Sequence, residues 1–181
     1  FIHHSYTVKI IGDYDGQIRL FNIHAHESEF ILEGYEGNTE QNTITHNAPN
    51  IFIRNATNVI VRQLVLKSPN TSNALRMDNS ATIDISSCVF EHVDTGDSTG
   101  FPLIWIVNCL ARVVNCSFSG NENGFGGIYA SDPSIVTSQN NFGVAGRYGL
   151  YARRGSVIAK SGSQPTGTNT DEGTAFGGVI R

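Results

Sequence analysis

The stretch TIDISSCVF, residues 82–90, carries the strongest structural signal in the chain because similar stretches flank it on both sides. VIVRQLVL (59–66) precedes it, and ARVVNCSF (111–118), SIVTSQNNF (134–142) and SVIAK (156–160) follow it. Large apolar residues recur in them 24, 28 and 24 residues apart: Leu66, Phe90, Phe118 and Phe142. Two residues before these stand Leu64, Cys88, Cys116 and Asn140. Positions two apart on a strand share one face, so we expect two internal ladders, with Asn140 buried and hydrogen-bonded to a turn carbonyl.

Each of these strands follows another short apolar strand, so the chain divides into repeating units from residue 51 onward. The units begin IFIRNATN (51), ALRMDNSA (74), LIWIVNCL (103), GGIYASDP (126) and GLYARRGS (149), with starts 23, 29, 23 and 23 residues apart. Such a period is typical of solenoids. We therefore predict an all-β, single-stranded right-handed parallel β-helix with coils of about 23–29 residues. Residues 1–50 are expected to form earlier, less regular coils, and residues 51–181 the regular coils and the C-terminal end of one continuous domain.

Other architectures explain the pattern less well. The consensus of leucine-rich repeats is missing, and apolar residues come in short runs rich in Val, Ile and Phe instead of at helical spacing. An antiparallel sandwich agrees with the alternation of strands and turns but leaves the repeating columns unexplained.

Composition excludes several classes of function. The net charge is −4 without a basic tract, which argues against nucleic acid, and no run of 18 apolar residues predicts a membrane span. Three cysteines at these spacings form neither a disulfide framework nor a zinc motif, and we expect no metal or cofactor. The start FIHHSYTVKI has no initiator Met and no signal peptide, so the sequence is expected to be a fragment of a longer protein.

Two groups of segments resemble known families. NATNVIVRQLVL (55–66), NSATIDISSCVF (79–90) and NCLARVVNCSFSGN (108–121) resemble rungs of the pectate-lyase-like β-helix superfamily. GRYGLYARRGSVIAKSGSQPTG (146–167), followed by GGVIR (177–181), resembles the terminal coils of bacteriophage and prophage tail-spike, appendage and tail-fibre proteins. The resemblance spans about residues 51–181. It implies a homotrimeric, extracellular adhesin of the virion tail that binds a host surface polysaccharide during adsorption. A polysaccharide depolymerase (hydrolase or lyase) on the same scaffold and a bacterial surface adhesin are the alternatives, whereas the Asp cluster and Arg base of pectate lyases have no counterpart here.

Acidic residues of one inserted loop are the candidates for catalysis. The longest unit owes its extra length to EHVDTGDSTGFP (91–102), and insertions in solenoids often lie on the binding face. Asp94 and Asp97, together with Glu122 in the corresponding loop of the next coil, are the candidate acid and base of a glycosidase. Glu91 lies in the same loop. The alternative is that these loops are simply soluble turns.

Aromatic and basic residues are the candidates for binding. Trp105 and Tyr151 occupy matching positions in their units, and Arg76 has the same position one unit before Trp105. Outward rings there could stack on sugars, or could belong to the core or to a trimer interface. The last coils also carry a group of basic residues that either bind an anionic glycan or protect a terminal strand edge: Arg147, Arg153, Arg154 and Lys160.

Three further patterns have structural consequences. LIWIVNCL is apolar on both faces, with Leu103, Trp105 and Val107 on one side, and an outward apolar face favours a trimer or a covering loop. His24 and His26 share a strand face but provide only half of a metal site. Asn residues recur at the turns, where they tolerate left-handed backbone, and are interpreted as structural: Asn55, Asn58, Asn79, Asn108 and Asn121.

Overall fold

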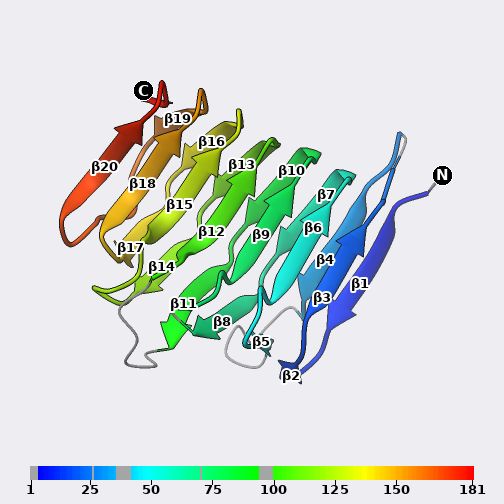
Figure 1. Ribbon diagram of the computed structural model, residues 1–181. Coiled ribbons are helices and arrows are strands. Elements are labelled where there is room, and N and C mark those ends of the chain that lie inside the picture. The colour runs from blue at the N-terminus through cyan, green and yellow to red at the C-terminus, as the bar shows by residue number, and fades with distance from the viewer. Residues whose placement is uncertain (1–3, 26, 36–41, 70, 94–99) are drawn as a thin grey trace.

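The computed structural model describes residues 4–25, 27–35, 42–69, 71–93 and 100–181. These residues form 21 β-strands and no helix, wound into a parallel β-solenoid of about seven turns (Figure 1). The all-β, parallel β-helix predicted from the repeats is therefore confirmed. No helix among the described residues is long and apolar enough to cross a membrane.

Three parallel sheets run along the solenoid, and each coil contributes about one strand to each of them. The eight-stranded sheet contains, in order, β1 (Tyr6–Ile10), β4 (Phe30–Gly34), β7 (Thr57–Arg62), β10 (Ala81–Ser86), β13 (Leu110–Val114), β16 (Ile135–Gln139), β19 (Val157–Ser161) and β21 (Val179–Ile180). The six-stranded sheet contains β2 (Tyr14–Asp15), β5 (Thr43–Thr45), β8 (Val65–Pro69), β11 (Val89–Val93), β14 (Ser117–Gly120) and β17 (Phe142–Ala145). The seven-stranded sheet contains β3 (Ile18–Phe21), β6 (Ile51–Arg54), β9 (Leu75–Asp78), β12 (Pro102–Val107), β15 (Gly126–Ser131), β18 (Tyr148–Arg153) and β20 (Thr170–Ala175).

Each stretch that looks like one long strand in the sequence is two strands in two sheets. Two residues separate them, and the first has left-handed backbone, with φ of 57° at Gln63, 52° at Ser87 and 53° at Asn115. One such residue redirects the chain without adding a loop, so the apolar pattern runs on unbroken through the corner. This explains why TIDISSCVF contains both β10 and the start of β11.

The predicted ladder of large apolar residues lies inside the solenoid. It includes one residue more at its N-terminal end than predicted and one residue fewer at its C-terminal end. Leu66, Phe90 and Phe118 are in register on β8, β11 and β14, as predicted, and Ile44 extends them toward the N-terminus. The rings of Phe90 and Phe118 stack with centroids 5.3 Å apart and planes 19° from parallel. All four side chains are buried, so this column is a continuous strip of the core.

The prediction that Phe142 ends this ladder is wrong. Gly143 lies opposite Phe118, and Phe142 lies opposite Ser117 with 54% of its surface exposed. The one-residue slip moves every side chain of β17 to the other face. Gly143 is itself exposed, and glycine suits its place because its φ is +104° and an added Cβ would lie 2.1 Å from the carbonyl oxygen of Phe118.

The same slip makes Asn141 the buried polar residue instead of Asn140. Asn141 has no exposed surface and takes the place that follows Cys116 in the second ladder. Its Oδ1 accepts from the Cys116 backbone N–H at 2.8 Å, and its Nδ2 donates to the Val113 carbonyl at 2.9 Å. Asn140 has the left-handed backbone of the corner, with φ of 50°. The buried asparagine is therefore the next residue, and the carbonyl that it bonds belongs to Val113 within strand β13 instead of to a turn.

Asparagines hold the turns between the seven-stranded and eight-stranded sheets, as predicted. Asn55, Asn79 and Asn108 have φ of 50–51°, and the side chain of Asn108 donates to Asn79 Oδ1 at 2.9 Å. Asn58 also has left-handed backbone, with φ of 55°. Asn121 is different, because its side-chain Oδ1 accepts from the backbone N–H groups of Asn123 and Gly124, as in an Asx turn.

A column of hydrogen bonds, called the turn ladder below, links the turns between the seven-stranded and eight-stranded sheets. The backbone N–H of Ser80 donates to Cys109 Sγ at 3.3 Å, and the N–H of Cys109 donates to Ser134 Oγ at 3.2 Å. The N–H of Ser134 donates in turn to Ser156 Oγ at 3.0 Å. Cys109 therefore has a structural place in a chain of otherwise hydroxyl-bearing residues.

The three cysteines are buried and are therefore expected to be unreactive in the folded protein. Burial raises the pKa of Cys109 to about 11 and that of Cys88 well above its usual value. A hydrogen bond with Cys88 lowers the pKa of Cys116, but this thiol is fully buried and out of reach of reagents. The thiolate is the reactive species, so native protein should incorporate no iodoacetamide at pH 8, and unfolded protein should incorporate three equivalents. Mass spectrometry after alkylation measures both, and rapid labelling of native protein would contradict the buried turn ladder.

The apolar strand LIWIVNCL differs from its prediction at one residue. Alternation groups Leu103 with Trp105 and Val107 on one face, but Leu103 lies near the start of β12 and is fully buried in the core. Trp105 and Val107 are half-buried on the outer side, and Ile104 is buried. A more exposed apolar row lies on the eight-stranded sheet, where Leu110, Ile135, Val157 and Val179 stand in register on four consecutive strands.

Candidate functional site

The outer face of the seven-stranded sheet carries one column of aromatic and arginine side chains. Alternation along β6, β9, β12, β15 and β18 directs aliphatic residues such as Ile104 and Ile128 into the core and their neighbours outward. In-register pairing then aligns the outward residues on successive coils. This column, called the aromatic ladder below, consists of Phe52, Arg76, Trp105, Tyr129 and Tyr151.

The contacts along the aromatic ladder are close and oriented. The rings of Tyr129 and Tyr151 stack with centroids 5.4 Å apart and planes 5° from parallel. Trp105 meets Tyr129 edge-to-face, with centroids 5.7 Å apart. The Trp105 indole N–H donates to Ser131 Oγ at 3.3 Å. Such ring pairs hold each other in place, so the ladder is a preorganised surface.

A second set of rings stands beside the ladder where β12, β15 and β18 begin. Phe101 lies 6.2 Å from Trp105 between ring centroids, and Phe125 lies 5.1 Å from Tyr129 and 5.0 Å from Tyr151. An open groove with a volume of about 380 Å³ is lined by Phe101, Trp105, Phe125 and Tyr129, with Arg147 beside them. This volume falls in the range of small-ligand sites, about 300–1,000 Å³.

The arginines predicted to bind ligand have different surroundings. Arg76 is held by Asp78 through two hydrogen bonds of 3.0 and 3.2 Å, and its guanidinium carbon lies 4.8 Å from the Trp105 ring centroid. Arg153 donates to the Tyr129 hydroxyl at 2.9 Å. Arg154 lies in the turn after β18 and pairs with Asp132 at 3.0 Å. Arg76 and Arg153 therefore support the rings of the ladder, and Arg154 lies apart from it.

The hydroxyl of Tyr151 remains protonated throughout the physiological range. Burial raises the pKa of Tyr151 above its usual value, and the neighbouring Tyr148 and Tyr129 act in the same direction. Tyr151 thus presents a neutral hydroxyl next to the apolar ring faces of the ladder, whereas Tyr129 is buried and its hydroxyl accepts from Arg153. Such surfaces suit ligands that have both apolar CH groups and hydroxyls.

Of the three predicted catalytic carboxylates, the structure describes Glu122 alone, so their proximity stays a prediction. Asp94 and Asp97 lie outside the described residues. Glu122 is exposed in the connection between β14 and β15. Glu91, on β11, pairs with Lys67 at 3.0 Å.

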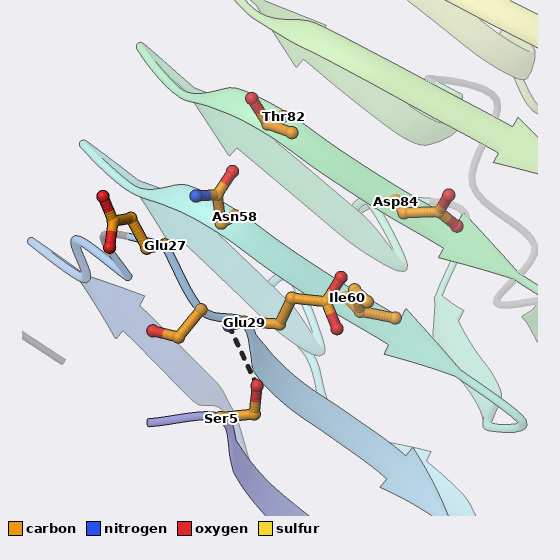
Figure 2. A pocket seen from close by; sticks show the side chains of 8 residues that line it. Ser5, Glu27, Glu29, Asn58, Ile60, Thr82 and Asp84 are labelled. Carbon is orange, nitrogen blue, oxygen red and sulfur yellow. Dashed lines mark hydrogen bonds between the residues drawn. The ribbon is translucent and has the colours of Figure 1, made fainter. Parts of the chain in front are cut away.

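An acidic pocket that the sequence did not indicate lies on the eight-stranded sheet near its N-terminal end. Glu27, Glu29 and Asp84 line this space of about 460 Å³, together with Asn58 and Thr82 (Figure 2). The two glutamates are exposed, and Asp84 is paired with Arg112 at 2.8 Å. A glycosidase acid needs a carboxyl in an enclosed, apolar setting, and neither the exposed glutamates nor the arginine-paired aspartate has one.

The structure describes one residue of the histidine pair. His24 is exposed and forms an isolated parallel bridge with Thr57, whereas His26 lies outside the described residues. Among the described residues, no three His, Cys, Asp or Glu side chains are grouped so that they could hold a metal ion.

Several groove residues escaped the sequence prediction. Trp105 pairs with Tyr129 and Tyr129 with Tyr151, so these coils are 24 and 22 residues long instead of 23 each. Coils of equal length would place Ile128 opposite Trp105 and Tyr151. The spacing of the sequence therefore does not indicate Tyr129 as a member of the aromatic ladder. A search for the strand alternation of GGIYAS would have directed Tyr129 outward, because Ile128 and Ala130 are both core residues.

Comparison with known proteins identifies no relative. No family model matches the chain, and no curated protein or solved structure is significantly similar to it.

Proposed function

We propose that this chain binds a bacterial surface polysaccharide in the groove beside the aromatic ladder. The observation that carries this proposal is the open groove lined by Phe101, Trp105, Phe125 and Tyr129. Pyranose rings have one face of apolar CH groups, which packs on aromatic rings, and hydroxyls at the edge, which meet polar groups such as the Tyr hydroxyls. A regular row of rings on successive coils also suits a polymer with a repeating unit.

The wider biological setting is part of the same proposal. The chain would be the β-helix part of a bacteriophage or prophage tail spike or appendage, located in the virion and active during adsorption. The resemblance of residues 146–167 and 177–181 to terminal coils of such proteins supports this setting. The aromatic groove and the solenoid are both compatible with it.

Assembly into a homotrimer also belongs to the proposal. Leu110, Ile135 and Val179 are 50%, 59% and 45% exposed on the eight-stranded sheet, and a contiguous exposed apolar row often marks an interface. Sedimentation equilibrium is expected to give three times the monomer mass of 19.6 kDa. A purely monomeric protein at high concentration would contradict this part.

Replacement of Trp105 by alanine tests the binding proposal. The ligand is a bacterial surface polysaccharide that wild type binds on a glycan array. The variant is expected to bind it about tenfold more weakly, a loss of about 1.4 kcal/mol in binding free energy, because a stacking surface of the groove is removed. Isothermal calorimetry of wild type and variant gives the two dissociation constants. Phe101→Ala, at a more exposed position of the same groove, should weaken binding without disturbing the Arg76 contact.

Phe142→Ala is the matched control, because Phe142 is an exposed aromatic residue on a different sheet. Its affinity for the polysaccharide should equal that of wild type. If Phe142→Ala weakens binding while Trp105→Ala and Phe101→Ala do not, the ligand binds elsewhere and the groove proposal is wrong.

A further inference from the structure

The basic residues of the last coils differ in what they contact. Arg154 pairs with Asp132, Lys160 pairs with Glu172, and Arg153 donates to the Tyr129 hydroxyl. Arg147 has an exposed side chain that forms no ion pair or side-chain hydrogen bond with any residue that the structure describes. One of the four cations thus remains available to a ligand.

The position of Arg147 is fixed by its backbone. Its N–H donates to the Gly124 carbonyl at 3.0 Å, and its carbonyl accepts from the N–H of Thr170 at 3.2 Å. The residue is therefore tied to the coils on both sides of it, just before β18 begins. From there its side chain lines the groove together with Trp105 and Phe125.

Among the described residues that line the groove, the charge is one-sided. Arg147 is the sole charged residue among the described residues that line it, and no described carboxylate lies there to neutralise it. Aromatic walls lower the local polarity, which strengthens an ionic contact relative to one in open water. A guanidinium also matches the planar geometry of a carboxylate and the oxygens of a phosphate through paired hydrogen bonds.

We infer that the groove takes an anionic glycan, with Arg147 binding the acidic group of one sugar while the neighbouring ring packs on Trp105 and Phe125. The shared chemistry is an oxyanion on a pyranose chain, either the carboxylate of a uronic acid or a phosphate diester. This inference rests on the proposed polysaccharide-binding function and narrows the class of its ligand.

An array of bacterial surface polysaccharides tests the inference. Each uronic-acid polymer is printed beside its carboxyl-reduced form, and each polymer that carries a phosphate diester in its side groups beside its dephosphorylated form. The proteins compared are wild type, Arg147→Gln and Arg154→Gln, which lose the same charge at an exposed residue inside and outside the groove. We expect wild type to bind the acidic member of a pair about tenfold more tightly, and Arg147→Gln to lose that preference.

The outcomes separate this inference from the function on which it rests. Arg154→Gln should keep the wild-type preference, and the type of pair affected distinguishes carboxylate from phosphate. If wild type binds acidic and neutral members equally, the anionic ligand is wrong while groove binding stands. If both variants behave alike, Arg147 is not the residue that binds the acidic group. If wild type binds no polysaccharide on the array, the proposed function itself fails.

Discussion

Phe90→Ala is expected to lower the free energy of unfolding by about 3–5 kcal/mol, the largest effect of any single substitution considered. Phe90 is fully buried and stacks on Phe118 in the internal ladder, with Leu66 on its other side. Truncation leaves a cavity between rigid neighbouring coils, and strands fixed by pairing on both sides cannot collapse into it. Denaturant unfolding followed by circular dichroism measures the loss.

Phe142→Ala is the comparison that tests the register. Because Phe142 is 54% exposed, its truncation is expected to change the free energy of unfolding by less than about 0.5 kcal/mol. The spacing of the sequence alone predicts the opposite, since it places Phe142 in the ladder with Phe90. Equal losses in the two variants would contradict the one-residue slip at β17.

Acidification from pH 7 to pH 4 is expected to destabilise the protein by as much as about 3 kcal/mol through His92 alone. Both ring nitrogens of His92 are buried without a hydrogen-bond partner among the described residues. Burial lowers the pKa of His92 from 6.5 to about 4, and a contact with the Ser72 backbone opposes this only in part. The unfolded chain therefore takes up a proton near pH 6.5 that the folded protein does not take up until about pH 4.

The contribution of neutral His92 to the free energy of unfolding is fully present above pH 6.5. It is lost as the pH falls from 6.5 toward 4, because proton uptake favours the unfolded state. His92→Leu removes the titrating group and should flatten the curve of unfolding free energy over this window. His24→Gln, at an exposed position, should keep the wild-type slope. A slope that His92→Leu leaves unchanged would show that other groups cause the pH dependence.

The fold could be predicted because a solenoid repeats its core. Leu66, Phe90 and Phe118 recur at one coil length, and recurrence at that spacing has few explanations other than stacked coils. The failures arise where coil length changes by one residue, because a slip of one exchanges inside and outside. Phe142 and Asn140 were misplaced for this reason, and Tyr129 was overlooked for the same reason.

The candidate site was predictable only in part. The match of Arg76 and Trp105 was visible because both directly follow short apolar runs, and the structure places them in one column. The groove itself depends on Phe101 and Phe125, which precede their strands and carry no periodic signal. The sequence also does not show which charged side chains pair with each other. The four basic residues near the C-terminus are therefore alike in the sequence, and the structure distinguishes Arg147 as the one without a described partner.

The most direct test of polysaccharide binding at the aromatic groove uses the fluorescence of Trp105, which is the single tryptophan of the chain. A polysaccharide selected on the array is titrated into the protein while tryptophan emission and its quenching by acrylamide are recorded. The account predicts a saturable change in emission and a loss of quenching, with the same dissociation constant that calorimetry gives. Saturable binding by calorimetry with unchanged emission and undiminished quenching would place the ligand away from Trp105 and contradict the account.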